Sequence, residues 1–257
     1  MSGLEQLAVL LAGFGAGVLS TTVGVASLLS FPVLLAVGLP PVVANVSNTI
    51  GLVPSGVGGG VGYRDELRVH PRVTAVVMVL TGVAGAGGAV LLLALPPGVF
   101  EAVVPWLILF TCLLVGIQPR LSSWLSGWRA RGGLEVHPRM RLSPLAMGFV
   151  LLTGIYGGYF GAGAGVMMIA TLALSLDIDF RVIAGIRTAG LLAANLVAAV
   201  VFVVVAEVDW MAVGLLSVSS ILGGYVGARL ARRLPATLLR ALVVVAGVTA
   251  SVLLLAS

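Results

Sequence analysis

Apolar stretches of membrane-spanning length recur along this 257-residue chain, separated by short turns rich in proline, glycine or charge. Hydrophobic residues make up 60% of the chain and charged residues only 9%, so a water-soluble fold would expose a largely apolar surface. The backbone must also satisfy its own hydrogen bonds inside a bilayer, and the sequence lacks the ten-residue alternating pattern of a membrane barrel. The chain is therefore predicted to be an all-α polytopic membrane protein.

Turn and charge signals divide the apolar sequence into eight segments, two of which are too long for simple crossings. The predicted segments are 4–37, 42–62, 72–95, 99–118, 145–175, 182–205, 211–228 and 238–256. A straight helix of 31 residues is about 46 Å long, against about 30 Å of hydrocarbon. We therefore expect both long segments to be re-entrant, broken-helix hairpins, with hinges at 20–24 and 161–165. A single tilted helix is the alternative in each case.

The second half of the chain repeats the glycine and polar pattern of the first. The offset between the two halves is close to 140 residues and drifts by single residues in the loops. We therefore predict a first repeat over 1–118 and a second over 145–257. The matched pairs are Gly13 with Gly154, Gly17 with Gly158, Gly24 with Gly165, Asn48 with Thr188, Ser55 with Asn195, Gly85 with Gly224 and Gly88 with Gly227.

Arginine positions predict the membrane orientation, because short cytoplasmic loops carry the excess of basic residues. The net charge of +5 comes from fourteen arginines, most of them at 63–72, in the linker 119–144 and at 229–240. The loops 95–101 and 206–210 have no basic residue and are expected outside. One hairpin and three crossings in each half then give two inverted repeats, a plan typical of secondary transporters. Eight plain crossings in parallel repeats are the alternative.

Arg187 is the residue that most directly indicates a functional site, because an ionisable side chain inside the membrane needs a partner or a role. It lies roughly 9 Å along the helix from Arg181, and its guanidinium suits a carboxylate, sulfite or sulfonate. Snorkelling to headgroups, or pairing with Asp177 or Asp179, is the alternative. Glycine hinges need a protein or wet surrounding, and half-helix N-termini attract anions, so both hinges are expected near this arginine.

Polar residues at matching positions of the two halves are predicted to line one cavity with this arginine. Hydrogen bonding between helices and close helix packing are the alternative roles of these hydroxyls, amides and glycines. The predicted substrate-binding residues are Arg187, Thr188, Asn195, Asn45, Asn48, Ser55, Ser20, Thr21, Thr22, Gly161 and Gly163.

Catalytic and metal chemistry have little support in the sequence. His70 and His137 both precede a proline in basic loops, and the acidic residues stay at segment ends. Cys112, the single cysteine, has no partner for an intrachain disulfide. We therefore expect no enzyme activity, no catalytic residue, no metal and no cofactor. The arginine clusters indicate membrane orientation rather than nucleic-acid binding.

Five motifs carry a family resemblance. They are Gly13-x3-Gly17, Phe31-Pro32-x5-Gly38, Ala44-Asn-Val-Ser-Asn-Thr49, Gly154-x3-Gly158-x2-Gly161-x-Gly163 and Ala184-Gly-Ile-Arg187-Thr188. In this combination the chain resembles the sulfite exporter TauE/SafE family of membrane permeases. The resemblance implies transport of sulfite, sulfoacetate or another small organic anion across the bacterial inner membrane. Many members have a glycine cluster where this chain has Ser20-Thr21-Thr22, whose hydroxyls can also donate to an oxyanion.

The predicted function is that of a multi-pass secondary transporter moving sulfite or an organosulfonate by alternating access. A passive anion channel, an uptake permease for another small organic anion and a non-transporting membrane subunit are the alternatives. The expected partners are the small anionic solute and the lipid bilayer, without nucleic acid. A coupling proton or sodium ion and a homo-oligomer are left open.

Overall fold

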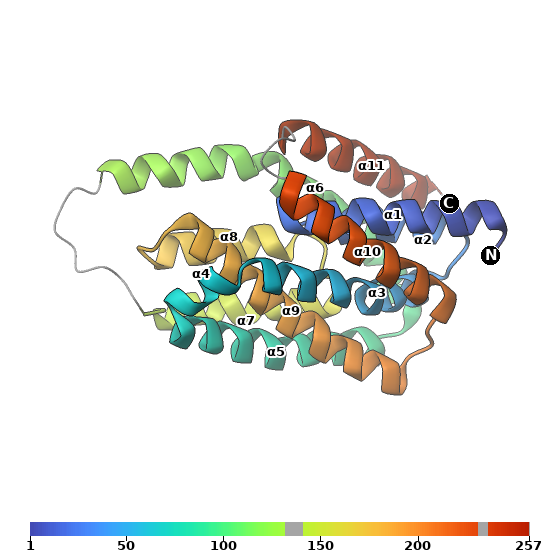
Figure 1. Ribbon diagram of the computed structural model, residues 1–257. Helices are drawn as coiled ribbons and strands as arrows, with labels where there is room; N and C mark the ends of the chain where they lie inside the picture. Colours follow the sequence, from blue (N-terminus) through green and yellow to red (C-terminus); the bar gives the residue numbers. More distant parts are fainter. Residues whose placement is uncertain (132–140, 231–235, 257) are drawn as a thin grey trace.

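Residues 1–131, 141–230 and 236–256 are described by the computed structural model, and within these ranges the regular structure is all helical (Figure 1). By length and composition, α1, α5, α9, α10 and Pro97–Arg120 of α6 can each cross a membrane, so the prediction of an all-α polytopic membrane protein is confirmed. The helices are α1 (Gly3–Thr22), α2 (Ser27–Ala36), α3 (Pro41–Gly62), α4 (Arg64–Val69), α5 (Pro71–Ala94), α6 (Pro97–Arg131), α7 (Pro144–Tyr159), α8 (Ala164–Ser175), α9 (Phe180–Val205), α10 (Trp210–Leu230) and α11 (Ala236–Ala256).

Local sequence signals determine where several helices begin. Ser2 and Glu5 form a reciprocal capping box at the start of α1. Ser143 Oγ accepts a hydrogen bond of 3.2 Å from the Ala146 N–H at the start of α7, and the Asp179 side chain caps α9. Prolines occupy the first positions of α3, α5 and α7, where a missing N–H removes no helical bond.

The first long segment forms two helices rather than one tilted helix. α1 ends where the backbone N–H groups of Val23 and Gly24 both donate to the Leu19 carbonyl, at 2.9 and 2.7 Å. Gly24 has φ +83°, a left-handed conformation that side chains with a Cβ rarely adopt. The chain therefore turns at this glycine and starts α2 at Ser27.

The second long segment breaks in the same way. α7 ends where the N–H groups of Phe160 and Gly161 both donate to the Tyr156 carbonyl, at 2.9 and 3.0 Å. Gly161 has φ +79°, and Gly163, which precedes α8, has φ +78°. Both halves thus end the long first arm of the hairpin with one carbonyl shared by two donors and a left-handed glycine.

The first break coincides with only the last part of the predicted hinge 20–24. Ser20, Thr21 and Thr22 belong to the last turn of α1, and the hydroxyls of both threonines donate back to the Val18 carbonyl, at 3.1 and 2.7 Å. Such back-bonds keep a hydroxyl within its own helix. By its turn geometry, Gly24 therefore corresponds to Gly161.

The second break likewise ends before Gly165, which already lies in α8. The sequence comparison paired Gly24 with Gly165 because the packed glycines upstream align at a constant offset. α1, however, continues about one turn further past its packed glycine than α7 does.

The second arms of both hairpins are too short to cross a bilayer. α2 has 10 residues and α8 has 12, which corresponds to roughly 15 and 18 Å, against about 30 Å of hydrocarbon. In Figure 1 α2 returns toward the end where α1 begins, and α8 returns toward the opposite end, where α7 begins. This arrangement does not fit eight plain crossings. The orientation of the halves in a membrane, and their inverted relation, stay predictions.

The central helices are α3 and α9, which pack against each other and against helices of the opposite half. α3 packs on α10 and α9 on α5, while α1 packs on α10 and α7 on α5. Glycines allow these close approaches: a Cβ on Gly88 of α5 would collide with the Ile155 carbonyl of α7, and one on Gly223 of α10 with the Phe14 carbonyl of α1. Each hairpin thus packs against the central helix of its own half and against outer helices of the other half: α10 and α11 for the first hairpin, and α5 and α6 for the second.

α6 is longer than predicted. Its expected end was residue 118, but the helix continues to Arg131, because residues 120–131 contain no proline and a single glycine. The expected linker 119–144 therefore begins as helix. Residues 132–140 of that linker, which include Arg139, and residues 231–235 lie outside the described residues.

Candidate functional site

The two helix breaks lie against each other. A Cβ on Gly165, at the start of α8, would come within 2.6 Å of the Gly24 carbonyl oxygen, so the two backbones are in contact. Phe31 of α2 and Phe160 of the second break pack edge to face, with ring centroids 5.3 Å apart. Both hairpins therefore meet at one point, beside the central helices α3 and α9.

Arg187 of α9 reaches this meeting point. Its side chain is buried, with 3% exposed, and Nη1 lies in the space that a Cβ on Gly24 would occupy. Nη2 donates to the Ser20 carbonyl and to Thr188 Oγ1, both at the long distance of 3.4 Å. Nε has no hydrogen-bond partner in the described part of the chain. The guanidinium thus has donors to spare.

No carboxylate balances this charge among the residues that the structure describes. The ion pairs there join Arg64 and Arg68 to Asp65, all three exposed. Asp179, a predicted alternative partner, accepts instead from the Arg181 N–H at 2.7 Å. A buried guanidinium without a counter-charge is costly by several kcal/mol, so an anion would stabilise it.

A cavity of about 60 Å³ opens beside the guanidinium, between α1, α2, α3, α9 and the two breaks. Its walls include the apolar side chains of Leu52, Leu191 and Leu192. Ser27, the first residue of α2, also lines it, and α2 has no side-chain cap. The N–H groups of Leu28 and Leu29 donate to the carbonyls of Val25 and Ala26, both at 3.2 Å. The positive end of the α2 dipole still adds partial positive charge to the cavity.

Six predicted site residues come together around this cavity, and they derive from both halves. Ser55 and Asn195 are of particular interest, because their side chains make no hydrogen bond in the described part of the protein. They remain available to a solute. The six are Ser20, Ser55, Gly161, Arg187, Thr188 and Asn195.

Five predicted residues do not line the cavity. The hydroxyls of Thr21 and Thr22 are bonded within α1, as described above. Gly163 supports the second break instead, where its missing Cβ leaves room for the Thr111 side chain of α6. Thr111 Oγ1 and Tyr156 Oη both lie within hydrogen-bond distance of the Ala162 carbonyl, at 2.9 and 2.7 Å, which holds the break in place.

Asn45 and Asn48 form a second polar group one to two turns along α3 from the cavity. Asn48 Oδ1 accepts from Ser30 of α2 at 2.5 Å, and Asn45 Nδ2 donates to the Tyr159 carbonyl at 2.9 Å. The two amides therefore tie α3 to both hairpins. Asn45 Oδ1 and Asn48 Nδ2, fully buried, have no partner in the described residues.

Sequence reasoning missed several contributors to the cavity. Gly24 was expected only as a hinge, yet its missing Cβ is what gives Arg187 its place. Ser27 directly follows the break, a position typical of helix starts, so it could have been found. Leu191 and Leu192 look like any other lipid-facing residues of an apolar helix, and no local signal distinguishes them.

The chemistry of the cavity is that of an anion-binding site. It offers one guanidinium, hydroxyls, one amide and the positive end of the α2 dipole, and no acidic side chain lines it. Groups of three or more potential metal ligands are likewise not found among the described residues. These groups can hold and orient an oxyanion by charge and hydrogen bonds.

Comparison of the sequence with known proteins finds one matching family and two related membrane transporter proteins. The sequence model of a family described as "Sulfite exporter TauE/SafE" matches residues 9–254. A "Probable membrane transporter protein" of Haemophilus influenzae is 24% identical over 246 residues, covering 95% of this chain and 92% of that protein. A "Probable membrane transporter protein ORF9" of a Sinorhizobium species is 26% identical over 249 residues, covering 95% and 90%. No solved structure matches the chain.

Proposed function

The chain belongs to the sulfite exporter TauE/SafE family of membrane transporters, and from that premise we propose that it moves a small anion across the bacterial inner membrane by secondary transport. The proposed substrate is sulfite or an organosulfonate such as sulfoacetate. The observation that carries this proposal is the burial of Arg187, without a carboxylate partner, at the contact of the two helix breaks.

A bound oxyanion would supply the counter-charge that Arg187 lacks. The planar guanidinium can donate two parallel hydrogen bonds to two oxygens of a sulfite or sulfonate group. Ser55 of α3 and Asn195 of α9 add neutral donors to the cavity. A neutral solute would leave the buried charge uncompensated, and a cation would be repelled.

The same geometry supports alternating access. Two short-armed hairpins with their breaks in contact resemble the broken helices that surround the binding site of inverted-repeat transporters. Displacement of one hairpin relative to α3 and α9 would open the cavity toward one end, and displacement of the other toward the opposite end. The contact between Gly24 and Gly165 is the point at which both movements would act.

Transport of labelled sulfite into proteoliposomes tests the role of Arg187. We expect Arg187→Ala to lower the initial rate about 30-fold or more, because removing one partner of a buried charged hydrogen bond costs about 2–5 kcal/mol. Arg187→Lys keeps the charge but not the planar fork, and should retain part of the activity. Arg181→Ala, an exposed arginine on the same helix, is the matched control and should transport normally.

Wild-type rates for a folded Arg187→Ala protein would contradict the assigned role. Thermal unfolding of each variant in detergent shows whether folding is retained. Uphill accumulation of sulfite under an imposed proton or sodium gradient separates a secondary transporter from a passive channel, which only equilibrates the anion. Flux by the purified protein alone separates both from a non-transporting subunit.

A further inference from the structure

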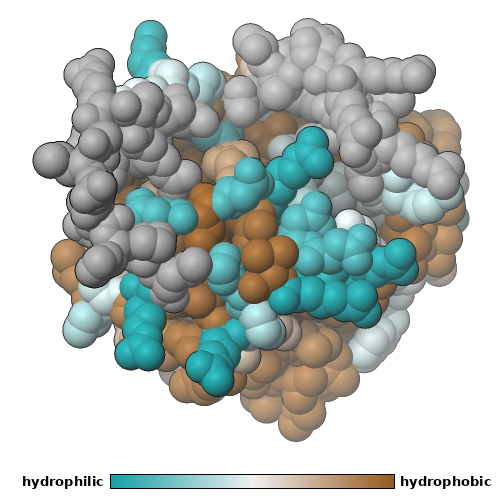
Figure 2. Space-filling view, turned by 60° about the vertical axis from the view of Figure 1, so that its left-hand side comes forward, coloured by the Kyte–Doolittle hydropathy of each residue, from teal (hydrophilic) through white to brown (hydrophobic). Residues whose placement is uncertain are grey.

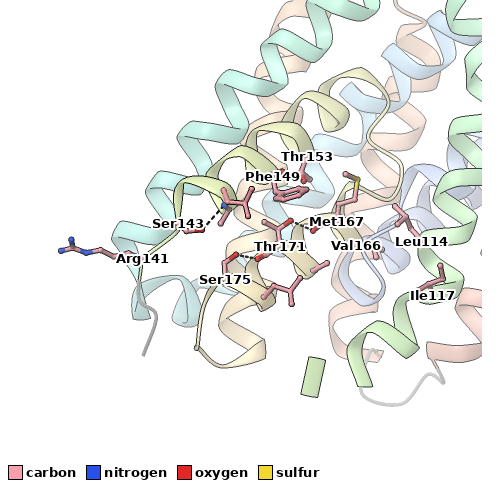
Figure 3. Close-up of a pocket in the computed structure, with 14 residues that line it drawn as sticks. Leu114, Ile117, Arg141, Ser143, Phe149, Thr153, Val166, Met167, Thr171 and Ser175 are labelled. Atoms are coloured by element: carbon pink, nitrogen blue, oxygen red, sulfur yellow. Dashed lines mark hydrogen bonds between the residues drawn. The ribbon is translucent and has the colours of Figure 1, made fainter. Parts of the chain in front are cut away.

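Two apolar grooves flank α7 near its start, away from the Arg187 cavity. The first measures about 580 Å³ and lies between α6, α7 and α8, with Phe149 and Met167 among its lining residues (Figure 3). The second measures about 640 Å³ and lies between α5 and α7, lined in part by Val76 and Met147. Each is far larger than the central cavity.

The grooves expose large apolar side chains at their mouths. Leu145, in the first turn of α7, is 74% exposed, and Phe149, one turn further, is 50% exposed. Val69 and Val76, which line the second groove, are also exposed. Apolar grooves on the side of a membrane protein favour acyl chains as their occupants, since each buried CH₂ contributes about 0.8 kcal/mol.

Basic side chains stand at the end where the two grooves meet. Arg141 lines both grooves, and Figure 3 shows its side chain extending away from the apolar residues of the first groove. Arg72 and His70 line the second groove with it. Neither arginine forms an ion pair with a carboxylate among the described residues, whereas Arg64 and Arg68 both lie near Asp65.

Hydrophilic residues gather on the face of the molecule seen in Figure 2, with hydrophobic surface between and around them. Two arginine-containing segments, 63–72 and the linker 119–144, make this the end predicted to be cytoplasmic. The cytoplasmic leaflet of a bilayer carries anionic lipids and a negative surface potential. The basic side chains thus lie where the headgroup of a phospholipid would be, and the apolar grooves lie where its acyl chains would be.

We propose that this end of the protein binds one anionic phospholipid of the cytoplasmic leaflet. Its phosphate is held by Arg141 and Arg72, and its two acyl chains occupy the grooves on either side of α7. The arginines form charge-assisted hydrogen bonds to phosphate oxygens, and the grooves select a lipid over a free ion. This site is separate from the proposed anion cavity and does not depend on the transport function.

Lipid titration of the purified full-length protein in detergent tests the site. Dioleoyl-phosphatidylglycerol should raise the melting temperature saturably and remain bound in native mass spectra, and dioleoyl-phosphatidylcholine should do so much less. The double variant Arg72→Gln/Arg141→Gln should bind the anionic lipid about fivefold more weakly per arginine removed. Arg64→Gln/Arg68→Gln removes the same charge from exposed arginines outside both grooves and should bind normally.

Two further experiments distinguish binding of the whole lipid from binding of phosphate alone. Inorganic phosphate should affect the wild type and the Arg72→Gln/Arg141→Gln variant equally, because it cannot fill the grooves and any binding in the Arg187 cavity is common to both proteins. Ala170→Phe, which narrows the first groove without changing charge, should also reduce the preference for phosphatidylglycerol. Equal stabilisation by the two lipids, equal loss in the Arg64/Arg68 control, or stabilisation by inorganic phosphate that matches phosphatidylglycerol and is lost in the Arg72→Gln/Arg141→Gln variant would each overturn the proposal. If Ala170→Phe does not fold, the arginine variants decide.

Discussion

Single residues determine the character of the central cavity, and Gly24 and Arg187 do so jointly. Gly24 adopts a left-handed backbone conformation, and Arg187 Nη1 occupies the space beside its Cα. Any side chain at position 24 would therefore both strain the backbone and displace the guanidinium. Gly38 shares the left-handed conformation, with φ +89°, but has open space around it. The two glycines separate these two effects.

Alanine substitutions at these glycines should differ in transport rather than in stability alone. Both Gly24→Ala and Gly38→Ala should lose roughly 1–2 kcal/mol from the left-handed conformation. Only Gly24→Ala should also lower sulfite transport, by about tenfold or more, because a displacement of about 1 Å at a binding group has large effects. Proteoliposome rates and thermal unfolding measure the two quantities. Equal transport by both variants would contradict the contact as a functional one.

Helices in this protein approach one another through glycines, and α5 shows the principle most clearly. Gly88 faces α7, where a Cβ would collide with the Ile155 carbonyl, whereas the neighbouring Gly87 faces open space. The two glycines have the same helical backbone and differ in what lies opposite. The close crossing of α5 and α7 fixes the first arm of the second hairpin, and with it the position of the second break.

Alanine at these two positions should shift stability in opposite directions. Gly88→Ala should destabilise the protein by about 1–3 kcal/mol, because the added methyl group overpacks the helix crossing. Gly87→Ala should be neutral or stabilising by up to about 1 kcal/mol, because alanine favours the helix more than glycine. Unfolding in detergent, followed by circular dichroism, measures both. A stabilising Gly88→Ala would show that the α5–α7 contact is looser than described.

At the scale of the whole molecule, the charges at its two ends predict which hairpin opens toward the cytoplasm. Arg64 and Arg68 of α4 and Arg72 of α5 lie near one end of the molecule, and Glu101 of α6 and Glu207, between α9 and α10, lie near the other. The two hairpins open toward opposite ends of the molecule (Figure 1). The first opens toward the end with Glu101 and Glu207, and the second toward the end with Arg64, Arg68 and Arg72. The positive-inside rule then predicts that the second opening faces the cytoplasm.

Cysteine labelling in intact bacterial cells tests this orientation. In a Cys112→Ala background, a membrane-impermeant maleimide should label Glu207→Cys and Glu101→Cys without permeabilisation. Asp65→Cys should react only after the cells are opened, because α4 is predicted to be cytoplasmic. The reverse pattern would place the protein upside down relative to the prediction, and labelling of all three in intact cells would reject the topology.

Sequence alone determined the properties that depend on composition and local chain chemistry. The apolar content requires helices in a bilayer, the length of two segments indicates that they are broken, and Arg187 stands out because charge is expensive in hydrocarbon. Positions of equal spacing in the two halves also pointed to Ser55, Thr188 and Asn195 as residues of one cavity, and the structure places all three beside it. These inferences succeed because they rest on solvation and on helical periodicity, which act at every residue independently of the partner helices.

Tertiary structure decided which polar residues face the cavity and which bond elsewhere. Thr21 and Thr22 bond back to α1, and Asn45 and Asn48 tie α3 to the two hairpins, although all four carry the same polar signal as Ser55. Whether a polar side chain faces the cavity depends on where its helix ends and on which helix packs against it. One additional turn of α1 is enough to include Ser20, Thr21 and Thr22 in the helix and leave the break at Gly24, and only the packed bundle determines that turn.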